Sequence, residues 1–299
     1  IQSIDKSRIS RYSEINSLTK TGKITANARI GAGDAPYKLL HVQENGELSN
    51  QETNQLSFLP YVHNVDSFGY NTSVIEKGIP YETERWGWVP GPANNGKVGV
   101  VNAPSIGLFE LGISAPARGL VNFSDIGAMT QAELNQLFDV LIEYKQKGHF
   151  SGFWTSVPES VRFMKSKRVV IESMFSPAVS ALNGMGVPVT FAAPKEGYRG
   201  WHGVMCLSAQ TQGRIKDVAY EYMNWWLSGW PGAFIAKQGY YISNPQRSKT
   251  FLSTAEYNYW YCCKAASHAL RGTDGEVSVT ACDIRPGGSE QNRLENVAV

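Results

Sequence analysis

The sequence predicts a two-lobed α/β protein. Its 299 residues exceed the size of one typical globular core, so two lobes of ordinary domain size are the simplest division. From about residue 68 to residue 200, runs of β-branched residues alternate with helical patterns, which is typical of βα units. Alternating strands and helices therefore predict the fold class, and chain length predicts the number of lobes.

The first part of the chain predicts few regular elements. Residues 1–55 are rich in Ser, Asn, Thr and Gly, with only scattered apolar positions, so we expect loops and short elements there. A strand is predicted over residues 56–62. The first βα unit is expected from a strand at 98–101, a turn at 102–105 and the helix that follows.

The helix after Thr130 is the clearest element in the sequence. Thr130 and Glu133 have the spacing of a capping box, and Gly148 is the predicted terminator. One face of the helix carries the apolar residues Leu134, Leu137, Phe138, Leu141 and Ile142.

Further elements are expected downstream. A β-branched run at 168–175 leads into Ser176-Pro177, where an N-cap is followed by proline at the first helical position. The remaining predicted strands are 187–193 and 204–208, separated by a Gly-rich aromatic stretch at 196–203 that we interpret as a crossing between lobes. Two helices are expected at 215–226 and 231–239, and an irregular tail after Phe251.

Charge and composition disfavour several classes of function. A net charge of +2, with dispersed Lys and Arg, provides no electrostatic footprint for nucleic acid or anionic lipid. No apolar run approaches the roughly 20 residues of a membrane span. Four cysteines without CxxC spacing disfavour a metal site, and a bridge from Cys282 to Cys262 or Cys263 remains open.

Three stretches resemble the spermidine/putrescine-binding group of extracellular solute-binding proteins. They are residues 59–61 leading to 69–71, Pro194-Lys195-Glu196-Gly197 with Trp201, and residues 219–244. The last is the most specific, with a helix ending in NWWLS, a short second helix and Gly239-Tyr240 before Asn244. Together the matches span nearly the whole chain.

The resemblance implies a two-lobed periplasmic-binding-protein fold of type II and a function in transport. Lobe one would comprise residues 1–66 and 202–299, lobe two residues 67–201, with two connecting strands as the hinge. Such proteins close around a ligand, and the closed form is recognised by an ABC permease in the inner membrane. The resemblance further implies a periplasmic monomer that needs no catalytic residue, cofactor or metal.

The resemblance also implies that both ends of the family's fold lie outside this sequence. A first strand and βα unit would precede Ile1, and a closing helix would follow Val299. Residues 1–9 lack the features of a signal peptide, so we expect the export signal in a longer precursor.

Two turns are candidates for binding through exposed helix N-termini. Strand ends and helix starts face the crevice in open α/β sheets, and their free N–H groups favour anions. Asn102 and Ser105 belong to the first turn and Ser176 to the second. Simple capping is the alternative for both serines.

Aromatic residues are expected to form the walls of the site. Trp201 matches the family's tryptophan, and Phe175 occupies the place of another stacking residue. The acidic residue that follows this tryptophan in polyamine binders is replaced, because the chain reads Trp201-His202-Gly203. Since a buried ammonium needs a partner, we expect a linear polyamine to be disfavoured.

Arg199 and Asp66 are the charged candidates. Arg199 could grip a ligand carboxylate with paired hydrogen bonds; the alternative is a surface arginine. Asp66, at the first lobe crossing, could hold a ligand amine, and its alternative is a polar contact that stabilises the hinge. Together they would suit an ω-amino acid or an amino-acid conjugate.

Tyr240 completes the predicted binding residues. Paired tyrosines such as Tyr240-Tyr241 bind ferric iron in some relatives of this fold. The favoured interpretation is that Tyr240 packs beneath the cleft. His202 could line the cleft, although a lone histidine more often satisfies a local hydrogen bond.

Two other functions are compatible with this fold, an enzyme and a ligand sensor. An enzyme on this fold would need Cys206 as nucleophile, yet the apolar surroundings predict a small buried residue in a strand. A ligand sensor that docks on a chemoreceptor would use the same cleft as a transport protein.

Overall fold

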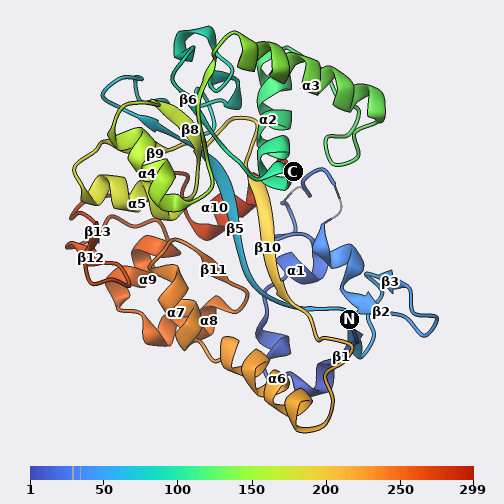
Figure 1. Cartoon of the computed structure of the whole chain (residues 1–299). Coiled ribbons are helices and arrows are strands. Elements are labelled where there is room, and N and C mark those ends of the chain that lie inside the picture. The colour runs from blue at the N-terminus through green and yellow to red at the C-terminus, as the bar shows by residue number, and fades with distance from the viewer. Residues whose placement is uncertain (29, 34) are drawn as a thin grey trace.

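The computed structural model describes residues 1–28, 30–33 and 35–299. Its elements form two groups, which two long neighbouring strands connect (Figure 1). One group holds residues from the middle of the chain, and the other combines the N-terminal and C-terminal parts. The mixed α/β architecture and the two lobes are as the sequence predicts.

The middle group contains the βα units. Its strands β6, β7 and β8 are parallel, and β9 joins them through β5. The strands are β6 (Val98–Val101), β7 (Phe150–Trp154), β8 (Ile171–Met174) and β9 (Val189–Phe191). The helices are α2 (Pro104–Arg118), α3 (Gln131–Gln146), α4 (Val157–Lys165) and α5 (Ser176–Gly184). All residues of β6 and β8 are buried, as expected for strands covered on both faces.

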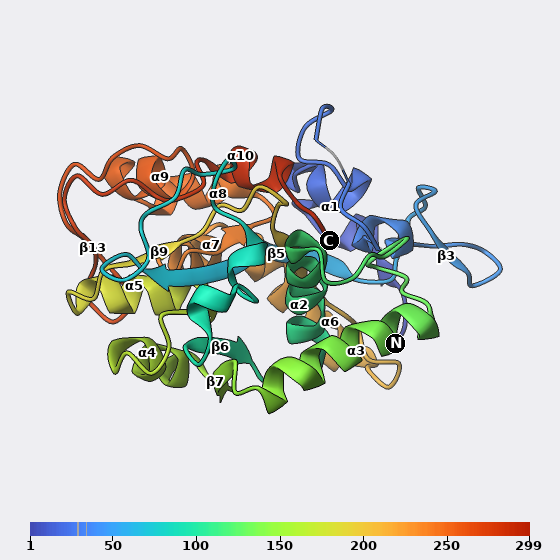
Figure 2. The same ribbon diagram turned by 90° about the horizontal axis from the view of Figure 1, so that it is seen from above.

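Strands β5 (Leu59–Asn71) and β10 (Arg199–Met205) connect the two groups as an antiparallel pair. At residues 62–63, β5 pairs with β11 (Tyr241–Ile242) in the C-terminal group. From residue 67 onwards it pairs with β8 and β9. In Figure 2, β5 lies between α9 and α10 on one side and α2, α3 and α4 on the other. A single strand therefore belongs to the sheets of both lobes.

The C-terminal group is mainly helical. Its helices are α6 (Gly213–Trp226), α7 (Trp230–Ala236), α8 (Pro245–Ser248), α9 (Thr254–Trp260) and α10 (Glu290–Glu295). A hairpin of β12 (Leu270–Arg271) and β13 (Val277–Val279) precedes α10. The chain then returns to the crossing, where Gly200 N–H donates to the Val299 carbonyl at 2.8 Å.

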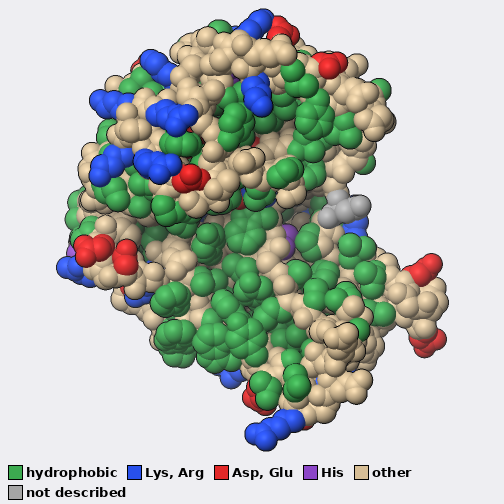
Figure 3. All heavy atoms as spheres, in the orientation of Figure 1, with side chains coloured by type: hydrophobic (Ala, Val, Ile, Leu, Met, Phe, Trp, Pro, Cys, Tyr) green, Lys and Arg blue, Asp and Glu red, His purple; other side chains and the backbone are tan. Residues whose placement is uncertain are grey.

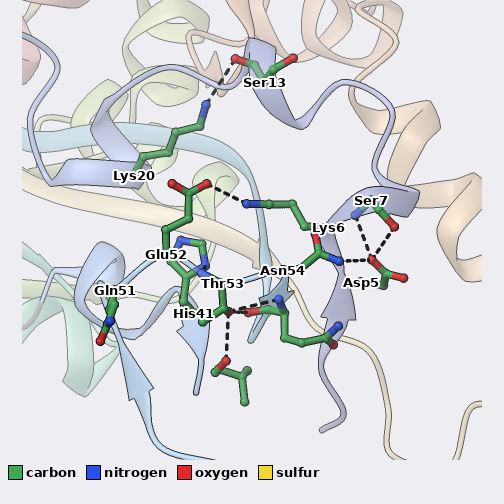
Figure 4. A network of polar contacts seen from close by, with 12 residues as sticks. Asp5, Lys6, Ser7, Ser13, Lys20, His41, Gln51, Glu52, Thr53 and Asn54 are labelled. Atoms are coloured by element: carbon green, nitrogen blue, oxygen red, sulfur yellow. Dashed lines mark hydrogen bonds and ion pairs between the residues drawn. The ribbon is translucent and has the colours of Figure 1, made fainter. Parts of the chain in front are cut away.

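The N-terminal segment folds into short elements against the C-terminal group, as predicted. A small sheet has the order β1-β4-β2-β3, and α1 (Leu18–Thr21) follows β1. The strands are β1 (Ile4–Asp5), β2 (His41–Val42), β3 (Leu48–Ser49) and β4 (Gln55–Leu56). Figure 4 shows the polar network that links them, in which Lys6 Nζ contacts Glu52 Oε1 at 2.7 Å.

Some sequence predictions need correction. The strand predicted at 204–208 is wrong, because β10 spans Arg199–Met205 and thus includes most of the Gly-rich stretch. The strand predicted at 56–62 forms, but it starts at Leu59 and continues to Asn71. The tail after Phe251 is also more regular than expected, since Ser253 and Glu256 form a capping box at the start of α9. The four cysteines are unpaired.

Helix α3 has the predicted capping box, but its apolar face is only partly used. Leu137 is fully buried, whereas Phe138 and Ile142 are about half exposed. A larger exposed apolar area covers α6 and α7, visible in the lower half of Figure 3. Among the described residues, no helix is long and apolar enough to cross a membrane.

Candidate functional site

The crossing strands place Asp66 and Arg199 directly opposite each other. Two register positions further along, Trp201 faces Asn64. Because side chains in a strand alternate between faces, Asp66, Asn64, Arg199 and Trp201 share one face of the β5–β10 pair. Three of the predicted site residues, Asp66, Arg199 and Trp201, therefore lie on one face of the two paired strands.

An open cavity of about 390 Å³ lies on this face, a size within the range of small-molecule sites. Its lining combines a charged pair with three aromatic rings and one helix start. The residues are Asp66, Ser105, Ile106, Phe175, Arg199, Trp201 and Tyr240. Six of the eight predicted binding residues therefore surround one space.

The aromatic walls come from both lobes. Trp201 on β10 and Tyr240 after α7 are packed edge to face, with ring centroids 5.7 Å apart. Phe175, at the end of β8, is held by a T-shaped contact with Trp154 at 5.0 Å. Trp201 and Phe175 thus share one crevice rather than lying in separate interiors.

Helix α2 contributes a carboxyl group that the sequence analysis missed. Glu110 lies one turn after Ile106, and its Oε1 is 3.4 Å from Arg199 Nε. On the other side, Arg199 Nη2 is bonded to Asp66 Oδ2. Two buried carboxyl groups therefore share one buried guanidinium, so the cluster carries one net negative charge when both are ionised.

Burial favours the protonated, neutral forms of Asp66 and Glu110. Loss of solvent raises the pKa of Asp66 to about 6, although Arg199 opposes the shift. The pKa of Glu110 rises to about 8 for the same reason, with Arg199 lowering it and the Asp66 charge raising it further. Within the described part of the chain, Glu110 Oε2 has no hydrogen-bond partner, so the cluster has unused capacity for a cation or a proton.

The structure alters the interpretation of Arg199. The alternative of a surface arginine is wrong, because the residue is only 7% exposed. Its guanidinium is occupied by Asp66 and Glu110. Asp66 is likewise engaged across the β5–β10 pair, so the two residues contact each other rather than standing apart for opposite ends of a ligand.

The two predicted helix-start sites are separated. Ser105 lines the cavity, whereas exposed Asn102 does not. Ser176 lines a different cavity of about 410 Å³. Capping explains neither serine, because α2 and α5 start after Ala103 and Phe175 and have no side-chain cap hydrogen bond.

A smaller space of about 120 Å³ is also lined by Trp201, together with Asn64 and His202 among other residues. Burial lowers the pKa of His202 to about 3, which keeps the ring neutral. Asn64 Oδ1 and His202 Nδ1 both lack hydrogen-bond partners. His202 therefore faces a cleft, but it is not part of the charged cluster.

Tyr240, Tyr241 and Cys206 lie in three different surroundings. Tyr241 is buried and its hydroxyl accepts a 2.7 Å hydrogen bond from Arg285, whereas Tyr240 lines the cavity. Cys206 follows the end of β10 and is exposed, so the prediction of a buried strand cysteine is wrong. It does not line the 390 Å³ cavity.

Comparisons with known proteins identify the fold. No family model and no curated protein sequence matches the chain. A spermidine/putrescine ABC transporter substrate-binding protein, PotD from Streptococcus pneumoniae, aligns with TM-score 0.56 and 15% identity over 85% of this chain and 65% of its own. A putative spermidine/putrescine ABC transporter from Listeria monocytogenes gives TM-score 0.56 and 15% identity over 86% and 67%. The Atu4243-GABA receptor gives 0.53 and 14% over 86% and 69%.

The chain thus has the fold of the substrate-binding proteins of ABC transporters, as the sequence resemblance implies. An ABC transporter substrate-binding protein from Bradyrhizobium japonicum, at 19% identity and TM-score 0.50, is covered to 58% of its length. The chain therefore spans roughly three fifths to two thirds of the length of these solved structures.

Proposed function

We propose that this chain is the ligand-capturing part of an ABC importer and that it binds a small solute with a primary amine between its lobes. The observation that carries the proposal is the pairing of an aromatic-walled cavity with a cluster of two carboxyl groups and one guanidinium at the crossing of the lobes. Aromatic rings and excess negative charge are what an ammonium needs when it leaves water.

The charge balance favours an amine over a bare carboxylate. Among the described residues that line the cavity, Arg199 is the only basic one, and it already contacts two carboxyl groups. A ligand carboxylate would have to displace Asp66 or Glu110, whereas an ammonium supplies the positive charge that the cluster lacks when both acids are ionised. The solved structures with this fold have titles that name spermidine, putrescine or GABA, all of which carry a primary amine.

Glu110 changes the expectation for linear polyamines, which rested on the absence of an acidic residue after Trp201. The sequence there predicts that a linear polyamine is disfavoured, but α2 supplies a carboxyl group from another direction. We therefore include polyamine-like solutes, ω-amino acids and amino-acid conjugates in the proposed ligand class.

The proposal extends to the partner and the location. Closure of the lobes over the ligand would create the surface that a membrane permease recognises, with a periplasmic monomer as the acting form. Ser105 and Phe175 would contact the ligand's far end from lobe two, whereas Asn102, which does not line the cavity, would reach the ligand only after closure. Ser176 belongs to the neighbouring cavity, so its part in this site depends on closure.

The test is a thermal-shift screen of the chain against putrescine, spermidine, GABA, succinate and glucose. A ligand that binds the native state raises the melting temperature by mass action. We expect stabilisation by at least one amine and none by glucose. Stabilisation by glucose alone would overturn the proposal.

A further inference from the structure

The 410 Å³ cavity contains two buried guanidinium groups whose charge is not neutralised. Arg285 is 5% exposed and Arg293 1% exposed, and both line the cavity. Among the described residues, neither guanidinium lies within ion-pair distance of a carboxylate. Asp283, which also lines the cavity, accepts a hydrogen bond from the Tyr259 hydroxyl at 2.5 Å, and Glu290, in the same helix as Arg293, contacts His63 at 3.0 Å.

The two arginines differ in how far their donors are satisfied. Arg285 donates to the Tyr241 hydroxyl at 2.7 Å and to the carbonyls of Trp260 and Gly239 at 2.6 Å each. The Arg293 guanidinium makes one long hydrogen bond, 3.5 Å from Nη1 to the same hydroxyl, and lies over the rings of Phe191 and Tyr198 at 5.1 and 5.5 Å. Its Nε and Nη2 are buried and have no hydrogen-bond partner among the described residues, which is costly for a charged donor unless an acceptor arrives.

The rest of the lining suits an anion. Helix α5 begins at this cavity with Ser176, whose hydroxyl makes no capping bond, and the start of a helix carries partial positive charge. Lys77 and Thr280 lie at the exposed rim. The half-buried carboxyl of Asp283 is the opposing charge.

This cavity is distinct from the amine site, although the two are neighbours. Phe175 and Tyr240 line the 390 Å³ cavity, while their chain neighbours Ser176 and Gly239 lie in contact with each other beside Arg285. A methyl group added at Gly239 would come within 3.0 Å of Ser176 Cβ. This contact lies between the cavity that contains Asp66 and Arg199 and the cavity that contains Arg285 and Arg293.

We propose that the cavity around Arg285 and Arg293 is a second binding site, which takes a small oxyanion such as phosphate or a carboxylate. An anion there contacts both lobes, because Arg285 and Arg293 come from the C-terminal group while Ser176 and Thr190 come from the middle group. Paired guanidinium hydrogen bonds provide the recognition.

Thermal-shift titration of the chain with sodium phosphate and with succinate tests the site, with sodium chloride at equal ionic strength as control. We expect at least one oxyanion to stabilise the protein beyond chloride. Phosphate alone would identify a tetrahedral anion, and succinate alone a carboxylate. Equal responses to all three salts would overturn the site.

Rim variants test the location without removing a buried arginine. Thr280→Glu places a competing negative charge at the cavity and should weaken oxyanion affinity at least fivefold, whereas Thr280→Lys should strengthen it at least twofold. Wild-type affinity in both variants would contradict the assignment. Trp201→Ala should lose amine binding but keep the oxyanion response, so failure of one site is distinguishable from failure of the other.

Discussion

Asp66 and Arg199 face each other across the two strands that connect the lobes, and their carboxylate and guanidinium are in direct contact. Glu110 from α2 contacts the same guanidinium. The ion cluster thus ties the two connecting strands to the first helix of the middle group, and its members Asp66 and Arg199 line the proposed amine site.

Removing the guanidinium should destabilise the fold. Arg199→Met leaves two buried carboxyl groups without their cation, which typically costs about 3–5 kcal/mol. The free energy of unfolding from urea denaturation measures the loss. Arg162→Met is the matched control, because Arg162 pairs with Glu159 on the surface, where such a pair is worth less than about 1 kcal/mol. Equal losses in the two variants would contradict a structural role for the cluster.

Stability should fall as the pH rises from about 5 to about 8. Glu172 is buried, accepts a 2.9 Å hydrogen bond from Ser160 and makes no ion pair among the described residues. Burial raises its pKa from 4.5 to about 8. Between these values the native state keeps a proton that the unfolded state has lost, so the free energy of unfolding decreases by at most about 1.4 kcal/mol per pH unit for this group.

Glu172→Gln isolates this contribution in urea denaturation at several pH values. In this variant the free energy of unfolding should decline less steeply between pH 5 and 8. The decline that remains comes from Asp66 and Glu110, whose pKa values burial also raises. Glu159→Gln is the control, because hydrogen bonds from Thr155 lower the pKa of Glu159 below this window. A slope unchanged by Glu172→Gln would show that this carboxyl group does not titrate as its burial implies.

The two connecting strands were implied by the family resemblance rather than by local sequence patterns. The strand predicted from local pattern ended at residue 62, short of Asp66, and residues 196–203 were interpreted as a crossing between lobes, whereas β5 and β10 run through both positions. The exact span of β10 was missed, since Gly200 and Gly203 made residues 196–203 resemble a loop, although cross-strand pairing overrides that weak propensity.

Glu110 could have been found, and the arginine cavity could not. Glu110 is the single acidic residue in α2, one turn after Ile106, and a lone carboxylate in an apolar helix beyond a βα turn indicates a buried role. Arg285 and Arg293 lie more than 80 residues from Ser176 in sequence. Only tertiary packing brings these three residues to one cavity, so no local pattern reveals it.

Amine affinity should increase with pH. Binding of an ammonium favours the ionised forms of Asp66 and Glu110, whose pKa values burial raises to about 6 and about 8. Calorimetry at pH 6, 7 and 8 should therefore show binding that tightens as the pH rises, with a release of protons on binding that is largest at pH 6 and declines towards pH 8. In Glu110→Gln the dependence above pH 7 should flatten. Affinity independent of pH would indicate that the ligand does not sense the cluster.

Cys206 should be reactive but dispensable. Its exposed position predicts alkylation in the native protein, detectable by mass spectrometry, whereas half-buried Cys263 should react more slowly because burial raises its pKa. Cys206→Ser should leave amine affinity within twofold of the wild type. Loss of binding in this variant would revive the interpretation of a cleft cysteine with a functional role.

Calorimetric titration of Trp201→Ala with the amine that stabilises the wild type tests the central claim most directly. Trp201 lines the cavity, while Trp225 on α6 is 44% exposed and does not line it, so Trp225→Ala is the matched control. The proposed site predicts at least a tenfold loss of affinity in Trp201→Ala and wild-type affinity in Trp225→Ala. Wild-type affinity in Trp201→Ala would show that the amine binds elsewhere.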